Sequence, residues 1–529
     1  MSSSSTPPSF TRPDLLRQLN QPIEWDLIII GGGATGLGVA LDGLSRGYRT
    51  LLLEKADFAK GTSSRATKLV HGGVRYLAQG DLGLVREALH ERGLLLQNAP
   101  HLCQNQSFII PNYEWWGGAF YILGLKAYDL LAGRLSLGPT THIGKAEALG
   151  RLGNLRPAGL YGGVVYHDGQ FDDARLAINL AQTGIELGGT LLNYVAVRGL
   201  LKDAHGQIAG VQATDQETGQ SYELRGKAVV NATGIFVDEI LQLDAPGSPR
   251  LVRPSQGVHL VVDKSFLPGH DALMIPKTDD GRVLFAVPWH GRLILGTTDT
   301  PVPESSEEPQ ALDEEIDFIL RTAGRYLARP PQRHDVRSVF AGLRPLAAPQ
   351  AGNGPTKELS RSHKILVSPA GLVTITGGKW TTYRRMGEDT VDRIIALGKL
   401  PPAPSQTARL RIHGAQATTD YGNHLYVYGS DQAALQQLIA TAPALGEKLD
   451  PQLEFVRAEV VWAARHEMAR TVEDVLARRV RVLFLDAAAA IRMAPTVAAL
   501  LAGELGHDVS WQQQQLANFE RVARHYLLR

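Results

Sequence analysis

The feature that most constrains this chain is a glycine-rich turn that follows its first apolar strand. Residues 27–30 are leucine and isoleucine, which is typical of a strand buried in a parallel sheet. Gly31, Gly33 and Gly36 follow with the spacing GxGxxG. In this motif the first glycine permits a tight turn, the second lets the backbone approach a pyrophosphate, and the third lets a helix pack on the strand.

The segments that follow complete a dinucleotide-binding unit. Residues 34–46 predict a helix whose first N–H groups face the phosphates, and residues 50–53 predict a second buried strand. Glu54 ends that strand, where an acidic side chain can accept hydrogen bonds from ribose hydroxyls. Because strand, glycines, helix, strand and acid occur in register, the sequence predicts a dinucleotide site rather than a structural turn.

The next segment favours FAD over NAD. GTSSRATKLVHGGVRYL (61–77) supplies hydroxyls, glycines and cations where an NAD-binding unit would continue with another helix and strand. Two later segments, KAVVNATG (227–234) and LVTITGGKWTTYR (372–384), each run from a strand into a turn of small residues. The predicted cofactor contacts are Gly31, Gly33, Gly36, Glu54, Thr62, Ser63, Ser64, Lys68, His71, Val195, Asn231, Ala232, Thr233, Gly234, Gly378 and Thr381.

The full set of motifs points to one family. GGGATG, SSRATKLVHGGVRYL, VVNATG, GTTD, AGLRPL and GGKWTTYR occur in this order. The chain resembles, over roughly residues 22–529, the FAD-dependent glycerol-3-phosphate dehydrogenases of the respiratory type. The resemblance implies oxidation of sn-glycerol 3-phosphate to dihydroxyacetone phosphate by hydride transfer to flavin N5, with electrons passed to ubiquinone or menaquinone.

A small phosphorylated substrate should be bound mainly by cations and hydrogen bonds. The resemblance maps substrate contacts onto Arg75, Tyr76, His259, Arg344, Arg361 and Lys379. Arg344 and Lys379 are also expected to stabilise charge that develops on the substrate oxygen. His259 and His71 are both candidates to accept the hydroxyl proton; we favour His259 as the base and His71 as a partner on the flavin side.

The predicted fold class is α/β, with a discontinuous Rossmann-like FAD domain, an inserted α+β substrate domain and an all-helical C-terminal domain. The predicted division is a flexible tail at 1–21, an FAD domain at 22–75, 170–235 and 340–395, a substrate domain at 76–169 and 236–339, and a helical domain at 406–529. Strands at 257–262, 283–288 and 292–297 predict an antiparallel sheet over the flavin. The helical domain is expected to cap the substrate domain or to form a homodimer.

Composition excludes several other classes. With 54 basic and 53 acidic residues the net charge is +1, which argues against a nucleic-acid-binding protein. The single cysteine, Cys103, excludes an internal disulfide and fits a cytoplasmic protein. No metal site is predicted.

Two segments leave membrane contact open. Residues 115–125 (WWGGAFYILGL) are either a buried core segment or one that dips into a bilayer interface. Arg478, Arg479 and Arg481 either meet anionic lipid or form a solvated helix face. With the resemblance, we expect peripheral association with the inner face of the cell membrane.

Three other functions are compatible with parts of the pattern. An oxidase acting on the same substrate would use O₂ and produce hydrogen peroxide. An amino-acid oxidase on the same scaffold is disfavoured, because one carboxylate needs only one bidentate arginine. A flavin-binding scaffold without catalysis is the alternative outside the enzymes. Within the GTTD motif, Thr298 and Asp299 either shape the pocket floor or end a strand with turn chemistry.

Overall fold

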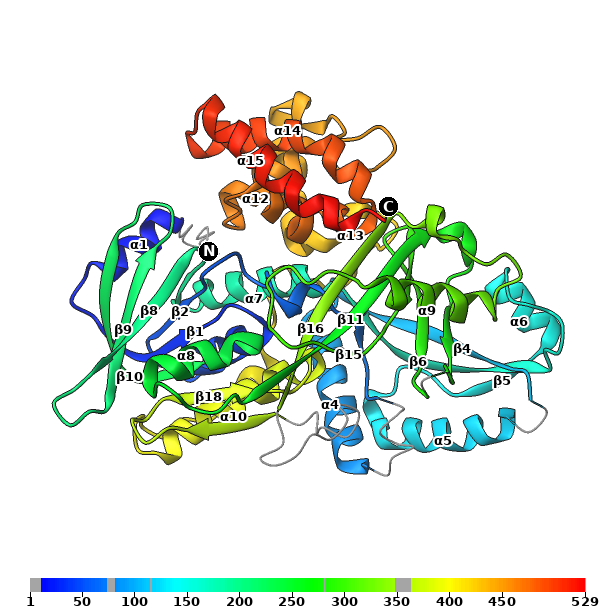
Figure 1. Cartoon of the computed structure of the whole chain (residues 1–529), viewed down its shortest axis with the longest axis horizontal. Helices are drawn as coiled ribbons and strands as arrows, with labels where there is room; N and C mark the ends of the chain where they lie inside the picture. The colour runs from blue at the N-terminus through cyan, green and yellow to red at the C-terminus, as the bar shows by residue number, and fades with distance from the viewer. Residues whose placement is uncertain (1–10, 74–80, 115–116, 280, 348–362, 529) are drawn as a thin grey trace, which may run out of the picture.

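The computed structural model describes residues 11–73, 81–114, 117–279, 281–347 and 363–528. Within these residues the strands form two sheets that lie side by side, and the C-terminal helices cover them from one side (Figure 1). The predicted α/β class is confirmed, with the helical C-terminal region following both sheets in the chain.

The first sheet carries the dinucleotide motif. Its strand order is β17-β18-β10-β1-β2-β7, and β9 and β8 extend it from β10. The strands are β1 (Glu24–Ile30), β2 (Thr50–Leu53), β7 (Thr190–Leu192), β8 (Val195–Lys202), β9 (Ile208–Asp215), β10 (Ser221–Asn231), β17 (Lys364–Val367) and β18 (Val373–Thr376).

Parallel register brings the three glycine-containing turns together. Ile30 pairs with Asn231, and Asn231 pairs with Thr374, so β1, β10 and β18 end at one edge of the sheet. The turns that follow these strands are therefore neighbours in space although they are far apart in the sequence. Ligands of open α/β sheets bind outside this carboxyl edge.

Three helices pack around the first sheet: α2 (Ala34–Ser45), α7 (Asp173–Glu186) and α10 (Tyr383–Ala396). α2 contacts both α7 and α10. It approaches α10 closely through two glycines, since a Cβ on Gly387 would lie 2.3 Å from the carbonyl oxygen of Gly38. This contact holds the third glycine-containing turn, which precedes α10, beside the first.

The prediction of a flexible tail through residue 21 is wrong for residues 12–19. These residues form α1 (Arg12–Leu19), whose Leu15 and Leu19 are buried in the core of the first sheet. The Arg12 guanidinium lies 2.7 Å from the Asp215 carboxylate at the end of β9. The serine- and proline-rich composition of the first residues gave no sign of this packing.

The second sheet has the order β15-β11-β14-β13-β12-β4-β6-β3, with β16 paired to β11 and β5 to β6. Its strands are β3 (Leu69–Val70), β4 (Cys103–Asn112), β5 (Thr141–Gly144), β6 (Gly162–Phe171), β11 (Val252–Asp263), β12 (Ala272–Ile275), β13 (Leu284–Trp289), β14 (Arg292–Gly296), β15 (Thr300–Pro301) and β16 (Ser338–Ala347). β11, β14 and β13 pair antiparallel, as predicted.

Two strands of this sheet lie in ranges that the sequence assigned to the FAD domain. β16 pairs along β11 from Ser338 to Ala347, so residue 340 falls inside a strand of the second sheet. β3 pairs with β6, so the second sheet already begins before residue 75. The motifs near both boundaries face the space between the sheets, and motif position alone does not show to which sheet the backbone is bonded.

Helices and short turns complete the two sheets. Helices of this part are α4 (Leu82–Asn98), α5 (Gly117–Ala132), α6 (Lys145–Leu152), α8 (Val237–Asp244) and α9 (Asp313–Gly324). The 3₁₀ turns are η1 (Thr62–Ser64), η2 (Gly133–Leu135), η3 (Gly234–Phe236), η4 (Lys264–Phe266), η5 (Arg333–Asp335), η7 (Trp380–Thr382), η8 (Thr407–Arg409), η9 (His424–Asp431), η10 (Pro443–Gly446) and η12 (Arg524–Tyr526), and η11 (Asp474–Arg479) is a π-helix.

The region after residue 406 packs in two places. α11 (Gln432–Thr441) contributes Leu435 to the core of the first sheet. The later helices α13 (Val482–Leu485), α14 (Ala487–Leu505) and α15 (Val509–Ala523) share a core with Trp289 and Phe340 of the second sheet, and α12 (Arg457–His466) contacts both cores. Among the described residues, α14 alone has the length and composition of a membrane-spanning helix; its alanine-rich face packs against α12 and α15.

The three C-terminal arginines that the sequence assigned to lipid or solvent are buried. Arg478 and Arg479 both bind the carboxylate of Asp57 in the loop after β2, and Arg481 lies 2.8 Å from Asp173 on α7. Burial opposes ionisation of Asp57, but the two guanidinium charges outweigh it and hold the pKa of Asp57 below its usual value. Removing one partner of such a buried pair costs about 3–5 kcal/mol, so this network anchors the C-terminal helices.

A histidine ties the segment after residue 406 to the first sheet. His413 Nδ1 lies 2.6 Å from Glu186 of α7, and its Nε2 lies 2.7 Å from Asp431. Burial alone would lower the pKa of His413, but hydrogen bonds to Asp431 and Glu186 outweigh it and raise the pKa to about 9. His413 is therefore protonated at neutral pH.

This pKa predicts a pH-dependent stability. The folded pKa of His413 lies above its unfolded value of about 6.5, so the stabilisation is complete below pH 6.5 and is lost as the pH rises through 9. We expect His413→Gln to destabilise the protein at pH 6 by on the order of 1–2 kcal/mol, reduced by solvent screening at Glu186, and to have little effect at pH 10. Melting temperatures of the two proteins at both pH values measure this, with the exposed His205→Gln as control. A difference that does not shrink at pH 10 would contradict the assignment.

Candidate functional site

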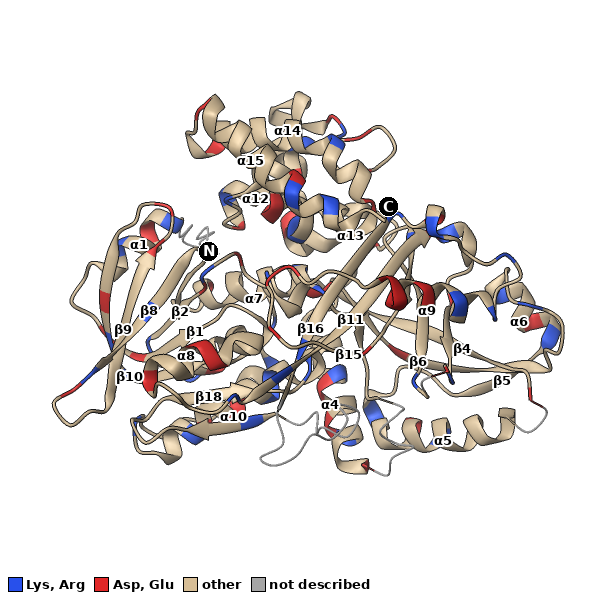
Figure 2. Cartoon of the chain, viewed as in Figure 1, with Lys and Arg blue, Asp and Glu red and all other residues tan. Residues whose placement is uncertain are grey.

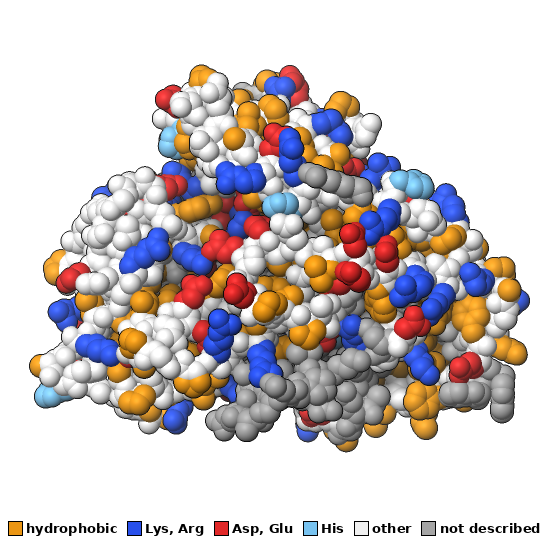
Figure 3. Space-filling model, viewed as in Figure 1, with side chains coloured by type: hydrophobic (Ala, Val, Ile, Leu, Met, Phe, Trp, Pro, Cys, Tyr) orange, Lys and Arg blue, Asp and Glu red, His pale blue; other side chains and the backbone are white. Residues whose placement is uncertain are grey.

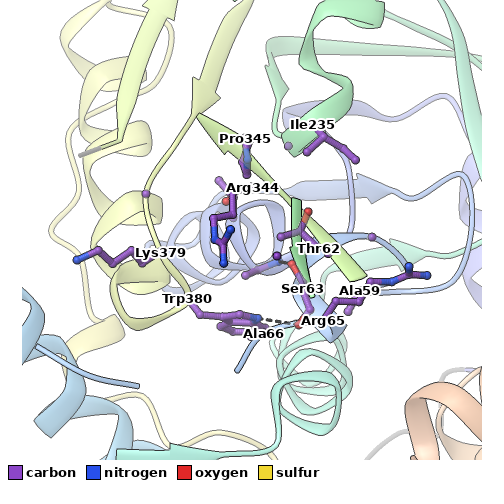
Figure 4. A pocket seen from close by; sticks show the side chains of 18 of the residues that line it. Ala59, Thr62, Ser63, Arg65, Ala66, Ile235, Arg344, Pro345, Lys379 and Trp380 are labelled. Atoms are coloured by element: carbon purple, nitrogen blue, oxygen red, sulfur yellow. Dashed lines mark hydrogen bonds between the residues drawn. The ribbon is translucent and has the colours of Figure 1, made fainter. Parts of the chain in front are cut away.

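A cavity of about 510 Å³ lies between the two sheets. Its walls come from the three turns at the carboxyl edge of the first sheet, from β11, β12, β13 and β16 of the second, and from the segment that follows β14. Figure 4 shows how segments far apart in the sequence face this space: Thr62 and Ser63 from η1, Ile235 from η3, Arg344 from β16, and Trp380 from η7.

The first turn leaves no room for side chains. Gly31 has φ of 108°, which favours glycine, and a Cβ on Gly36 would lie 1.9 Å from the Gly31 carbonyl oxygen. The helix α2 can therefore start directly against the turn, and its N-terminus faces the cavity. This is the cradle that a pyrophosphate requires.

Glu54 stands where the sequence predicted it, beyond the end of β2. Its carboxylate accepts hydrogen bonds from the N–H groups of Gly32, at 2.6 Å, and Ala56, at 2.8 Å. Burial raises the pKa of Glu54, although these two hydrogen bonds oppose the shift. The side chain lines the cavity beside the glycine turn, which is the position expected of a ribose-binding acid.

Eleven of the predicted cofactor residues line the cavity. They are Gly31, Gly33, Glu54, Thr62, Ser63, His71, Ala232, Thr233, Gly234, Gly378 and Thr381. The Ser63 hydroxyl accepts from Ala34 N–H at 2.9 Å and so caps α2, while the Ser63 carbonyl accepts from the Trp380 indole at 2.8 Å (Figure 4). Segment 61–77 is thus hydrogen-bonded both to the start of α2 and to segment 372–384.

The other five predicted cofactor residues do not line the cavity. Gly36 lies beneath the turn, against Gly31, and Ser64 points its hydroxyl at the Gly61 carbonyl. Val195 is buried in the core, although its neighbours Ala196 and Val197 face the cavity. Asn231 donates to the Val237 carbonyl at 2.9 Å and so shapes the turn from behind.

Lys68, the fifth of these residues, requires the largest correction. Its amine is fully buried behind the cavity, 2.7 Å from Asp173 and 2.7 Å from the Ser64 carbonyl. Burial lowers the pKa of Lys68 to about 7, while Asp173 opposes the shift. The amine therefore makes its hydrogen bonds with protein groups, and it does not line the cavity where the cofactor would bind.

Three of the six predicted substrate residues line the cavity, and the other three are not described by the structure. Arg344 and His259 line the cavity, and Lys379 also lines it but points its side chain away from Arg344 in Figure 4. Arg344 donates to the Gln256 carbonyl at 3.3 Å and to Thr297 at 3.2 Å. The other three predicted substrate contacts lie outside the described residues: Arg75, Tyr76 and Arg361.

The two candidate bases are held differently. His259 Nε2 lies 2.9 Å from the Thr67 hydroxyl, and its ring stacks on Phe340 with centroids 4.8 Å apart. Burial, followed by the charges of Lys68 and Arg344, lowers the pKa of His259 well below its usual value. His71 also lines the cavity, and its backbone N–H donates to Thr381 at 3.3 Å. Both assignments stay predictions.

Arg282 is a charged cavity residue that the motifs of the sequence did not predict. Arg282, just before β13, lines the cavity beside Asp299. The sequence of the hairpin around His290 and Gly291 could have predicted this contact. The register that pairs Phe285 with Gly296, continued past the strands, places Arg282 opposite Asp299. Asp299 lines the cavity too, which favours the pocket-floor interpretation of the GTTD motif.

Comparison with known proteins identifies the family. The family model described as "FAD dependent oxidoreductase" matches residues 26–384, and the one described as "C-terminal domain of alpha-glycerophosphate oxidase" matches residues 373–515. A probable mitochondrial glycerol-3-phosphate dehydrogenase of Caenorhabditis elegans is 40% identical, over 96% of this chain and 74% of its own. The human mitochondrial enzyme is 38% identical, over 98% of this chain and 75% of its own.

The chain belongs to the FAD-dependent glycerol-3-phosphate dehydrogenase family. The glycerol-3-phosphate dehydrogenase of Bacillus halodurans, whose crystal structure contains FAD, is similar with a TM-score of 0.79 and 28% identity, covering 98% of this chain and 97% of its own. An L-alpha-glycerophosphate oxidase of Mycoplasma pneumoniae with FAD bound shares the fold, with a TM-score of 0.56 and 16% identity over 73% of this chain and 98% of its own. The predicted FAD cofactor is confirmed, and the glycine turn, the α2 N-terminus and Glu54 are the residues here that fit it.

The close approach at Gly36 yields a direct test of this cofactor site. We expect Gly36→Ala to lower the amount of FAD bound per protein at least about tenfold, because the added methyl group overlaps the Gly31 carbonyl oxygen. Gly61→Ala is the matched control: Gly61 lines the cavity, has φ of −78°, and leaves open space for a Cβ. The flavin-to-protein absorbance ratio of the purified proteins measures the effect. Equal flavin content in the two variants would show that the turn is not the cofactor cradle.

Proposed function

We propose that this chain oxidises sn-glycerol 3-phosphate to dihydroxyacetone phosphate with FAD and passes the electrons to ubiquinone or menaquinone. The observation that carries the proposal is the combination of the FAD cradle with an arginine-lined wall in the same cavity. Several relatives bear the name glycerol-3-phosphate dehydrogenase, which supports the substrate. The phosphate carries a charge of about −1.5 to −2 at neutral pH, which arginine forks match well.

The protein residues bind and position the substrate. When bound, FAD supplies the hydride acceptor, and the protein must hold the carbinol carbon and remove the hydroxyl proton. Arg344 contributes a fixed positive charge for the phosphate and for charge that develops on the substrate oxygen. The lowered pKa keeps the His259 ring neutral, as a general base must be, but it also makes the ring a weak base, so His71 stays the alternative acceptor of the hydroxyl proton.

An apolar end of the cavity supports a quinone as electron acceptor. Phe108, Tyr166 and Met274 line the cavity and belong to a cluster that also includes Leu125 of α5. A flat, apolar quinone ring suits such a wall better than it suits the arginine side.

The outer face of α5 supports contact with a membrane. Phe120, Leu123 and Leu130 are 62%, 76% and 82% exposed. Hydrophobic side chains project along the lower right of the molecule in Figure 3, where Figure 1 places α5, and the helix carries little charge in Figure 2. A surface helix with an apolar face can lie in a bilayer interface. We propose that α5 docks the protein peripherally on the inner face of the cell membrane; the homodimer stays a prediction.

A second candidate is an oxidase of the same substrate that returns electrons to O₂. It is favoured by the C-terminal family model, which is described for alpha-glycerophosphate oxidase, and by the shared fold of the Mycoplasma oxidase. Peroxide formed per substrate oxidised, in air and with or without a short-chain quinone, separates the two. Near-stoichiometric peroxide in the presence of quinone would favour the oxidase.

The central test of the proposed function is anaerobic flavin reduction. We expect sn-glycerol 3-phosphate to bleach the flavin absorbance of the holoenzyme and a quinone to restore it. A protein that keeps its yellow colour with this substrate would be a flavin-binding scaffold or an enzyme of another substrate.

Arg344 allows a test of the substrate side alone. We expect Arg344→Ala to raise the KM for sn-glycerol 3-phosphate on the order of a hundredfold, about 2–3 kcal/mol, because the phosphate loses a charge-assisted partner. FAD content should be unchanged. Arg253→Ala, an exposed arginine on the neighbouring strand β11, is the matched control. Loss of flavin with an unchanged KM in the reconstituted protein would show that Arg344 serves the cofactor instead.

The exposed face of α5 yields a test of membrane docking. We expect Phe120→Asp combined with Leu123→Asp to weaken binding to phosphatidylethanolamine and phosphatidylglycerol vesicles at least about tenfold, since two apolar side chains no longer enter the interface. Turnover with a water-soluble dye should be retained. Val509→Asp, on α15 and 64% exposed, is the control. Vesicle binding equal to that of the unmodified protein would place the docking face elsewhere.

A further inference from the structure

One carboxylate in the cavity joins two arginines. Asp299 follows β14, and its side chain is only 4% exposed. Arg344 Nη1 lies 3.2 Å from its Oδ1, and Arg282 Nη1 lies 3.8 Å from its Oδ2. The Ser255 hydroxyl also donates to Asp299. All three charged side chains line the cavity, and the two guanidinium groups lie next to different oxygens of one carboxylate.

The segment that carries Asp299 is fixed from behind by a second carboxylate. Glu315, near the start of α9, accepts from Thr298 at 2.7 Å and from Thr300 at 2.6 Å. The Gln256 amide donates to the same carboxylate at 2.7 Å. Because both neighbours of Asp299 are bonded to one buried group, its carboxylate has a defined position.

Arg282 is positioned from a separate element. It closes a turn in which its N–H donates to the Thr278 hydroxyl at 3.0 Å, and Thr278 N–H donates to its carbonyl at 3.0 Å. Asp279 in the same turn lies 2.9 Å from Arg325 of the α9 end. The side chain of Arg282 is 13% exposed, and the next residues, Val283 and Phe285, line the cavity as well.

We propose that Arg282 is a second phosphate-binding arginine of the proposed substrate site and that Asp299 is the residue that positions Arg282 and Arg344 as a pair. This inference rests on the proposed function for the identity of the substrate. Two guanidinium charges and one carboxylate leave a net charge of about +1, which a phosphate of −1.5 to −2 binds favourably. The Asp299 carboxylate also relieves the repulsion between the arginines while no phosphate is bound.

The arrangement makes the site selective for the phosphate end of the substrate. An unphosphorylated polyol carries no charge for the two guanidinium groups to bind. If it displaced the Arg344 hydrogen bond and the Arg282 ion pair to Asp299, it would not replace the charge that they lose. A phosphate can accept from both forks while Arg344 keeps its hydrogen bond to Asp299 and Arg282 keeps its ion pair with it.

The test uses the FAD-loaded protein and two probes, sn-glycerol 3-phosphate and inorganic phosphate. We expect Arg282→Gln to raise the KM at least about tenfold, to raise the inorganic phosphate concentration that half-saturates the flavin difference spectrum by a similar factor, and to change kcat less than about threefold. Arg282→Lys keeps the charge but not the fork and should fall between. Asp299→Asn should raise both constants, with flavin content unchanged.

The matched control is Arg253→Gln, because Arg253 is an exposed arginine of β11 that does not line the cavity. A KM and a phosphate affinity of Arg282→Gln within about twofold of the unmodified protein, or equal losses in Arg253→Gln, would overturn the proposal and leave Arg282 without a role in phosphate binding. If the unmodified protein is not reduced by sn-glycerol 3-phosphate, the proposed function fails, and the phosphate titration still decides the role of Arg282.

Discussion

Parallel pairing of β1, β10 and β18 is the constraint on which the whole site depends. Three strands from distant parts of the chain end at one edge, and each continues into a turn that contains glycine. The turns can be neighbours only because small residues let backbone meet backbone, as at Gly36 and at Gly38 against Gly387. The second sheet then closes the cavity from the other side, with β11 and β16 presenting His259 and Arg344.

Buried charge fastens the C-terminal helices to this arrangement. Asp57, in the loop after the second Rossmann strand, binds two arginines of η11, and Arg481 reaches Asp173 beside Lys68. Burial lowers the pKa of His259, and the charges of Lys68 and Arg344 add to the shift. The C-terminal region contacts this part of the cavity wall through Asp173, which pairs with both Lys68 and Arg481, although η11 itself lies outside the wall.

The parts of the site that could be predicted from the sequence are those set by local backbone chemistry. Glycine spacing, strand runs and a terminal acid depend on neighbouring residues, so the turn at Gly31 and the position of Glu54 could be expected. Lys68 could not, because its partner Asp173 comes from α7, far along the chain. Periodicity does not distinguish a helix face that meets protein from one that meets solvent, which is why the exposure of α5 and the burial of Arg479 were left open or misassigned. The contact of Arg282 with Asp299 could have been predicted, because the register of the β13–β14 hairpin places the two residues opposite each other.

The most direct measurement is an experimental structure of the FAD-loaded protein with sn-glycerol 3-phosphate bound under anaerobic conditions. We expect the flavin ring to lie among the Thr62, Gly234 and Gly378 turns, with the phosphate between Arg344 and Arg282 and the carbinol facing His259. A flavin outside these turns, or a phosphate bound away from both arginines, would contradict the account.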